Sequence, residues 1–180
     1  GGYLEDGKGL NVYDTLVVTP EPGIESQYSD TKVATDHYHH FKEDIDLMAE
    51  MGIKAYRFSI IWSRIHPNGD DEANEKGLDF YEEMIDYMLS KGIEPVVSLV
   101  HFDMPDHLMR AYNGFLNKKV IDFYVEHVRC IAKRMNDKVK YWITYNETNL
   151  APYQSDLVAG TNKPDYMSKE EFYSQLYINI

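Results

Sequence analysis

The chain has 180 residues, enough for one domain with a sizeable core, and 43% of them are hydrophobic. This composition indicates a globular chain and excludes a disordered one. The net charge of −12 argues against nucleic acid as a partner, because phosphate binding requires clustered lysine and arginine. No apolar run is long enough to span a membrane. Cys130 is the only cysteine, which excludes an internal disulfide and suits a reducing compartment, so we expect a cytoplasmic protein.

Residues 1–36 are rich in glycine, proline, aspartate and threonine without periodicity, which predicts a long loop. A helical pattern follows, in which Phe41, Ile45 and Met48 share one face. Gly52 is the expected helix stop, and residues 53–61 are then predicted to form a strand with Arg57 in its middle.

The same unit recurs twice. A second amphipathic helix stops at Gly92 and leads into a predicted strand over residues 93–102, and a third leads into a strand over residues 141–147. The apolar positions that define these two helices are Leu78, Tyr81, Ile85, Met88 and Leu89, then Val120, Phe123, Tyr124, Val128 and Ile131. A polar loop is expected after Glu147, and Ser168 with Glu171 predicts the capping box of a last helix.

Helices that alternate with short apolar strands predict parallel βαβ units and an α/β fold. Three units are present, whereas a (β/α) barrel requires eight and typically about 250 residues. The periodicity therefore fits either a small open sheet or part of a larger barrel.

Polar side chains stand where the predicted strands end. His101 and Asp103 close the second strand, and Asn146 and Glu147 close the third. Open sheets and barrels keep their chemistry at the carboxyl ends of parallel strands. An isolated Asn-Glu pair is more commonly a helix cap or a surface feature, so the pair alone does not establish a site.

Five segments together resemble the retaining β-glycosidases of glycoside hydrolase family 1, from one end of the chain to the other. Each segment is weakly specific alone, but their order and spacing are very specific. They are Glu5-Asp6-Gly7-Lys8-Gly9, Asp36-His37-Tyr38-His39 with Lys42-Glu43-Asp44, Tyr56-Arg57-Phe58-Ser59 with Trp62-Ser63-Arg64-Ile65, His101-Phe102-Asp103-Met104-Pro105, and Thr144-Tyr145-Asn146-Glu147.

The resemblance implies a (β/α)8 TIM barrel, of which this chain covers about half, with strands 2–4 and their flanking helices. Residues 1–180 are then one partial catalytic barrel domain, from the N-terminal portion of a longer protein. The segment 101–105 and the segment 71–75 look most like the 6-phospho-β-glucosidase branch. Plain β-glucosidases of the family more often have Trp where Phe102 stands and Pro where Thr148 stands.

The resemblance also implies roles for four residues. Glu147 looks like the acid/base of a double-displacement mechanism, which requires a raised pKa that apolar neighbours such as Tyr145 can supply. Asn146 and His101 resemble the residues that hydrogen-bond sugar hydroxyls. Arg57 is a cation in an apolar strand and is expected to face a carboxylate. The resemblance makes that carboxylate the nucleophile, on a later strand beyond Ile180.

The residues leave room for different functions. Asp103 is the only further candidate for the second carboxylate. The tract His37, His39 and His40 allows a metal-dependent barrel hydrolase, although no apolar strand precedes it. A plain β-glucosidase and a non-catalytic sugar-binding remnant are equally compatible with the motifs. The preferred interpretation needs no metal or cofactor, takes a β-glucoside or a phosphorylated disaccharide as substrate, and is compatible with a homo-oligomer.

Overall fold

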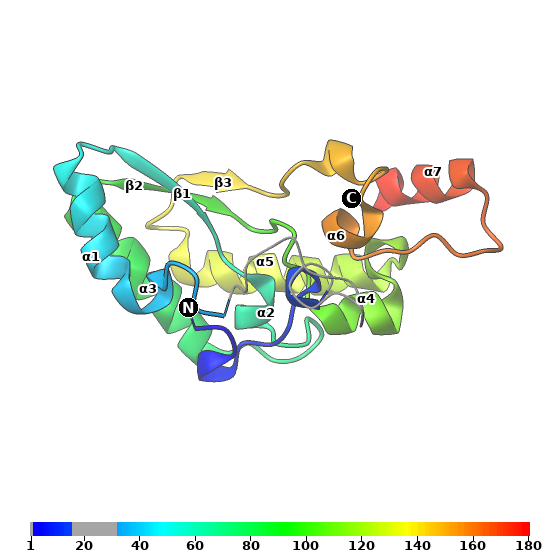
Figure 1. Cartoon of the computed structure of the whole chain (residues 1–180), viewed down its shortest axis with the longest axis horizontal. Helices are drawn as coiled ribbons and strands as arrows, with labels where there is room; N and C mark the ends of the chain where they lie inside the picture. The colour runs from blue at the N-terminus through cyan, green and yellow to red at the C-terminus, as the bar shows by residue number, and fades with distance from the viewer. Residues whose placement is uncertain (1, 16–31) are drawn as a thin grey trace.

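The computed structural model describes residues 2–15 and 32–180. Residues 16–31, where most of the predicted N-terminal loop falls, lie outside this range. Three strands and a set of helices alternate along the chain (Figure 1). In chain order the elements are η1 (Glu5–Gly7), α1 (His37–Glu50), β1 (Ala55–Ser59), α2 (Trp62–Ile65), α3 (Glu75–Ser90), β2 (Glu94–Ser98), α4 (Asp106–Tyr112), η3 (Gly114–Leu116), α5 (Lys119–Met135), β3 (Tyr141–Ile143), η4 (Thr148–Leu150), α6 (Ser155–Ala159) and α7 (Lys169–Asn179).

The three strands form one parallel sheet in the order β1-β2-β3, as the alternating pattern predicts. In the register of this sheet, Arg57 of β1 lies opposite Val96 of β2, and Ser98 of β2 lies opposite Ile143 of β3. The crossover helices α3 and α5 lie with α1 on one side of the sheet, and none of the described helices covers its other side in Figure 1. All strand ends that follow the direction of the chain therefore meet at one edge.

The predicted helix stops at Gly52 and Gly92 are confirmed, and the two joints are alike in detail. Both glycines have positive φ, 79° and 71°. The Ile53 N–H donates to Met48 O and the Ile93 N–H donates to Met88 O, each at 3.0 Å. This bond across six residues is the signature of a Schellman cap, which satisfies helix carbonyls and turns the chain into the next strand.

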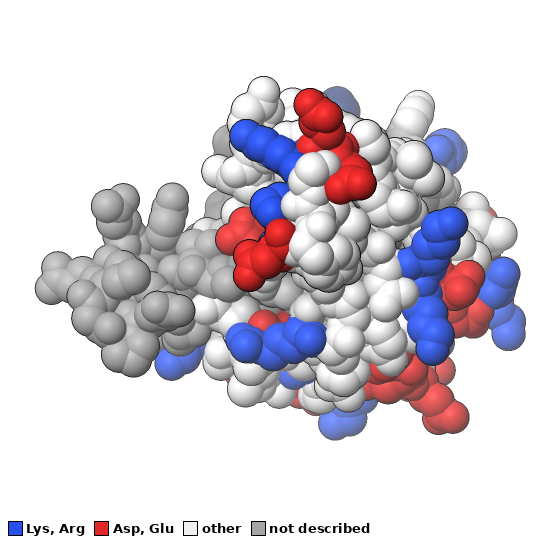
Figure 2. Space-filling model, turned by 90° about the vertical axis from the view of Figure 1, so that its right-hand side faces the viewer, with Lys and Arg blue, Asp and Glu red and all other residues white. Residues whose placement is uncertain are grey.

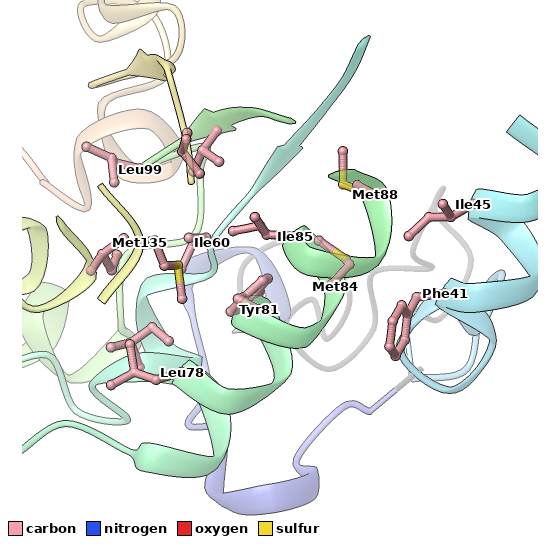
Figure 3. Close-up of a cluster of buried hydrophobic side chains, with 14 of the residues drawn as sticks. Phe41, Ile45, Ile60, Leu78, Tyr81, Met84, Ile85, Met88, Leu99 and Met135 are labelled. Atoms are coloured by element: carbon pink, nitrogen blue, oxygen red, sulfur yellow. The ribbon is translucent and has the colours of Figure 1, made fainter. Parts of the chain in front are cut away.

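The main core lies between α1, α3 and the sheet. Phe41 and Ile45, the predicted inner face of α1, point toward Met84 and Met88 of α3 (Figure 3). Ile85 is fully buried on the same helix. Burying such side chains contributes roughly 1.5–3 kcal/mol each. The apolar stripes identified from the sequence are thus the stripes that hold the helices against the sheet.

A second core fills the space beside the strand ends. Trp62 of α2 is fully buried there, as expected, and its ring stacks on the imidazole of His127 from α5. Phe115 of η3 and Phe172 of α7 belong to the same cluster. This core supports the loops that follow β1 and β2.

The strands are shorter than predicted, and β3 is less buried. The structure ends β3 at Ile143 instead of Glu147, and Tyr141 is 57% exposed. The expectation of a buried strand over residues 141–147 is therefore wrong for its outer half. β3 has only β2 as a neighbour, so its far edge and one face have nothing to pack against in the described residues.

The segment after Glu147 also differs from the expected polar loop, because it contains η4 and α6 and buries Ala151 and Val158. The capping box is confirmed: the Ser168 hydroxyl accepts from the Glu171 N–H, and the Glu171 carboxylate accepts from the Ser168 N–H. Cys130 was expected to be buried and is instead half-buried, and desolvation raises the pKa of its thiol.

Among residues 2–15 and 32–180, no helix combines the length and the apolar character that crossing a membrane requires.

Acidic and basic side chains are interspersed on the face that Figure 2 presents. Between α3 and α5 the two signs also pair, since Lys138 bridges Glu82 at 2.9 Å and Asp86 at 2.8 Å. The acidic balance is thus spread over paired helix surfaces.

Candidate active site

The carboxyl ends of the strands bring His101, Asn146 and Glu147 to one edge of the sheet. His101 follows β2 and Asn146 follows β3, and the two segments stay joined because the Asn146 N–H donates to Val100 O at 3.0 Å. Tyr124 of α5 fixes the same region, since its hydroxyl donates to Thr144 O at 2.7 Å. The strand-end position predicted for these residues is therefore what the fold produces.

Arg57 connects β1 to this edge. Its Nε donates to Ser98 Oγ at 3.0 Å, and its Nη2 donates to Asn146 Oδ1 at 2.7 Å. Ser98 is fully buried and Asn146 is 7% exposed, so both are rigid partners. The guanidinium thus spans all three strands and fixes the amide of Asn146 with its NH2 group free to face a ligand.

The expected carboxylate partner of Arg57 is absent from the described residues: the side chain is exposed, and no ion pair to it is found there. The energetic argument for a partner assumed a buried cation. Arg57 instead lies on the uncovered face of the sheet, where water solvates its charge.

Glu147 is exposed and lies just outside the strand. Its backbone has a φ of 51°, which is uncommon for a residue with a Cβ and turns the chain sharply into η4. The expectation that Tyr145 shields this carboxyl is wrong. Tyr145 is directed elsewhere: its hydroxyl donates to Val158 O, and burial raises the pKa of that hydroxyl.

His101 is exposed at the end of β2. Partial desolvation lowers the pKa of its imidazole most, the positive charge of Arg57 lowers it further, and the negative charge of Glu147 opposes both. Electrostatic coupling to both residues places His101 near them. A neutral imidazole can donate and accept hydrogen bonds, as a sugar hydroxyl requires.

Asp103 does not lie open to a substrate. It is 5% exposed, its Oδ1 accepts from the His101 N–H at 2.7 Å, and its Oδ2 accepts from the Trp62 N–H at 3.1 Å. Both carboxylate oxygens are therefore engaged with backbone. This geometry argues against Asp103 as the second carboxylate of the reaction.

The histidine tract opens α1 and binds carboxylates. His37 bonds to Asp44 at 2.6 Å, and His39 lies between Asp36 at 2.6 Å and Glu5 at 2.8 Å. Among the residues that the structure describes, no group of three or more histidine, cysteine, aspartate or glutamate side chains is arranged to hold a metal ion. These contacts tie the N-terminal segment to α1.

A cleft of about 300 Å³ lies beside His101, and its wall includes Phe102, Lys8 and Tyr13. Lys8 is buried and pairs with Asp14 at 2.9 Å. Glu147 and Arg57 lie outside this cleft, on the open face of the sheet. Within the described residues the candidate site is thus an exposed edge and an adjoining hollow.

Ser98 was missed from the sequence. It accepts the second hydrogen bond of Arg57 and is as buried as the valine before it. A serine inside an otherwise apolar strand was the available signal, because a buried hydroxyl requires a partner.

Comparison with known proteins agrees with this geometry. The model of glycosyl hydrolase family 1 matches residues 1–179. A 6-phospho-beta-glucosidase of Clostridium longisporum is 45% identical over 183 aligned residues, which cover 98% of this chain and 38% of the relative. Beta-glucosidase 25 of Oryza sativa is 48% identical over 147 residues, which cover 82% of this chain and 29% of the relative.

Solved structures give the same result. The rice beta-glucosidase Os3BGlu6 superposes with a TM-score of 0.80 at 44% identity, over 86% of this chain and 32% of that one. The family 1 beta-glucosidase of Thermotoga maritima gives a TM-score of 0.77 at 41% identity, over 84% and 34%. The likeness confirms the predicted (β/α) barrel fold, of which this chain contains three parallel strands.

The chain spans 38% of the length of the first of these relatives and less of the others. Its match to the family model nonetheless runs through nearly every residue. This chain belongs to glycosyl hydrolase family 1.

Proposed function

We propose that residues 1–180 form a partial catalytic barrel domain that supplies the acid/base side of a retaining β-glucosidase site. The observation that carries this proposal is the network in which Arg57 holds Asn146, next to Glu147 and close to His101. These four polar groups converge at the carboxyl edge of a parallel sheet, where barrel enzymes keep their chemistry. The second carboxylate comes from outside the 180 residues.

In this proposal Glu147 first acts as an acid. Its proton goes to the glycosidic oxygen as the bond from that oxygen to the anomeric carbon breaks, and the second carboxylate forms an ester with the same carbon. Glu147 then takes a proton from water, whose oxygen attacks the anomeric carbon and releases the second carboxylate. Each turnover returns the proton to Glu147.

Asn146 and His101 bind the sugar. Because Oδ1 of Asn146 accepts from Arg57, the Asn146 NH2 group is left to donate to a sugar hydroxyl. Such a bond accelerates the reaction when it strengthens in the transition state. The exposed His101 imidazole offers a second contact from β2.

The substrate class we propose is the 6-phospho-β-glucosides, handled in the cytoplasm. Phe102 and Thr148 support this branch, and so does the 45% identity to a 6-phospho-beta-glucosidase. A rice beta-glucosidase at 48% identity makes the plain β-glucosides the alternative. Assaying matched aryl β-glucosides with and without the 6-phosphate distinguishes the two.

The test of the proposal uses this chain alone and after mixing with the remaining part of the Clostridium longisporum relative, a mixture that we call the reconstituted enzyme. Two carboxyl groups about 5–5.5 Å apart are needed for retention, and only Glu147 is exposed at this site. We expect no turnover by the chain alone and turnover of an aryl β-glucoside 6-phosphate on mixing.

Turnover by the chain alone that Asp103→Asn abolishes would contradict the proposal and make Asp103 the nucleophile. A reconstituted enzyme that binds the sugar without turnover would indicate a sugar-binding protein instead.

A further inference from the structure

Asp103 is a buried carboxylate that the proposed mechanism does not use. Its two oxygens accept from the backbone N–H groups of His101, at 2.7 Å, and of Trp62, at 3.1 Å. His101 follows β2, whereas Trp62 opens α2 just after β1. One side chain therefore joins the ends of two neighbouring strands.

We propose that Asp103 is a positioning residue, which holds His101 at the height and angle that sugar binding requires. This inference rests on the proposed function, because His101 is a binding residue only if the chain acts on a sugar. Asp103 itself touches no substrate, and its effect passes through the backbone of His101.

The loop between the two residues needs such a support. Phe102 has a φ of 60°, a conformation that L-residues with a Cβ avoid. The His101 ring is exposed beyond this turn, so few packing contacts fix its direction. The bond from its N–H to Asp103 stabilises the turn that directs the ring toward Arg57 and Glu147.

The other end of the link is rigid. Trp62 is fully buried, and its ring stacks on the His127 imidazole at a centroid distance of 5.1 Å. The preceding residue is also fixed, because the Ile61 N–H donates to the Tyr81 hydroxyl at 3.0 Å. Asp103 thus ties an exposed ligand-binding residue to the core.

The charge of Asp103 makes the link depend on pH. The groups that face it are Lys8 from the N-terminal segment, Tyr81 of α3, Tyr124 of α5 and Tyr145 after β3. The Lys8 amine bonds to Asp14, not to Asp103. Burial raises the pKa of Asp103 to about 6, against the lowering effect of the backbone N–H groups. Protonation removes the negative charge that these two N–H groups stabilise.

The first measurement needs no variant. With only this chain isotopically labelled, the amide protons of His101 and Trp62 are followed by NMR as the pH is changed. We expect both signals to shift with one shared midpoint near pH 6, because both donate to one carboxylate. Independent midpoints, or no shift at either amide, would overturn the link.

The second measurement is a double-mutant cycle in the reconstituted enzyme. Asp103→Asn keeps one carbonyl acceptor but sets an NH2 group against the other N–H. We expect kcat/KM to fall about tenfold, mainly through a higher KM, and to fall little further when His101→Ala is already present, because the two changes remove the same contact. Asp70→Asn, at an exposed carboxylate near His107, is the matched control and leaves kcat/KM unchanged.

Additive losses in the cycle would overturn the positioning role and leave Asp103 a structural residue only. A reconstituted enzyme without any turnover would count against the proposed function, while the amide titration would still decide whether Asp103 holds His101.

Discussion

Asn146 and Glu147 are neighbours in opposite environments. Asn146 is 7% exposed and bonded on both its backbone and its side chain, whereas Glu147 is exposed after a backbone turn with a φ of 51°. The turn lets one residue stay rigid in the sheet while the next reaches outward. A binding amide and a proton-transferring carboxyl can therefore come from consecutive positions.

Glu147→Gln tests the proton-transfer role in the reconstituted enzyme. We expect turnover of glycosides with poor leaving groups to fall by roughly 10²–10⁴-fold, since these need a proton on the leaving oxygen. An activated aryl glycoside should lose much less in its first step, and added azide should restore its turnover by attacking the covalent intermediate. The rates are measured with both substrates, with and without azide. Equal losses on both, without rescue by azide, would remove Glu147 from this role.

Arg57→Lys tests whether the guanidinium fork matters beyond its charge. Arg57 donates to Ser98 and Asn146 from different nitrogens, and a lysine ammonium cannot reproduce this geometry. We expect a fall of at least about tenfold in kcat, with little change in the melting temperature because the side chain is exposed. Ser98→Ala, which removes one of the two acceptors, should give an intermediate loss. Near-normal turnover by Arg57→Lys would exclude Arg57 from the site.

At the scale of elements, the sequence predicted what local patterns control. The helix faces around Phe41 and Tyr81, the stops at Gly52 and Gly92 and the cap at Ser168 all depend on residues close together in the chain. The strand limits, η4 and α6 could not be predicted, because such short elements are fixed by contacts between distant segments.

The candidate site was predicted as a set of positions but not as a geometry. Resemblance identified Arg57, His101, Asn146 and Glu147, whereas the bond from Arg57 to Asn146 follows from the alignment of three strands. The backbone role of Asp103 was missed for the same reason, because its partner Trp62 lies in another unit of the fold.

Gly92→Ala tests the helix stops. A Cβ at this position meets nothing within 4 Å, so the cost is only that of a left-handed backbone, about 1–2 kcal/mol of unfolding free energy. Gly114→Ala is the contrasting variant, because its Cβ would lie 2.3 Å from the Ala159 carbonyl oxygen. Urea unfolding of both variants should give the larger loss for Gly114→Ala. Equal losses would mean that the space around these glycines does not matter.

At the scale of the molecule, two buried groups give stability opposite dependences on pH. His127 is fully buried beside Trp62 and His66, and desolvation lowers its pKa well below 6.5. The unfolded chain therefore binds its proton first, so His127 costs stability as the pH falls below 6.5. Burial raises the pKa of Asp103 from 3.8 to about 6, so its protonation favours the folded state as the pH falls from 6 toward 4.

His127→Gln separates these two effects. With the histidine removed, the free energy of unfolding should rise, or fall less, between pH 6.5 and pH 5, because the Asp103 contribution is then unopposed. A single group changes this slope by at most about 1.4 kcal/mol per pH unit. Urea midpoints of the wild type and the variant at several pH values check the prediction, with exposed His40→Gln as the control. Parallel curves for His127→Gln and the wild type would contradict it.

The two matching joints at Gly52-Ile53 and Gly92-Ile93 bear on how the chain folds during synthesis. Each helix is closed by bonds among residues that leave the ribosome within moments of one another, before the strand that follows has a partner. The start of that strand is set locally, so its alignment with the previous strand does not depend on sequence that has not yet been translated. A barrel assembled in this way grows one strand at a time in register, and the exposed edge of the newest strand is the template on which the next is placed.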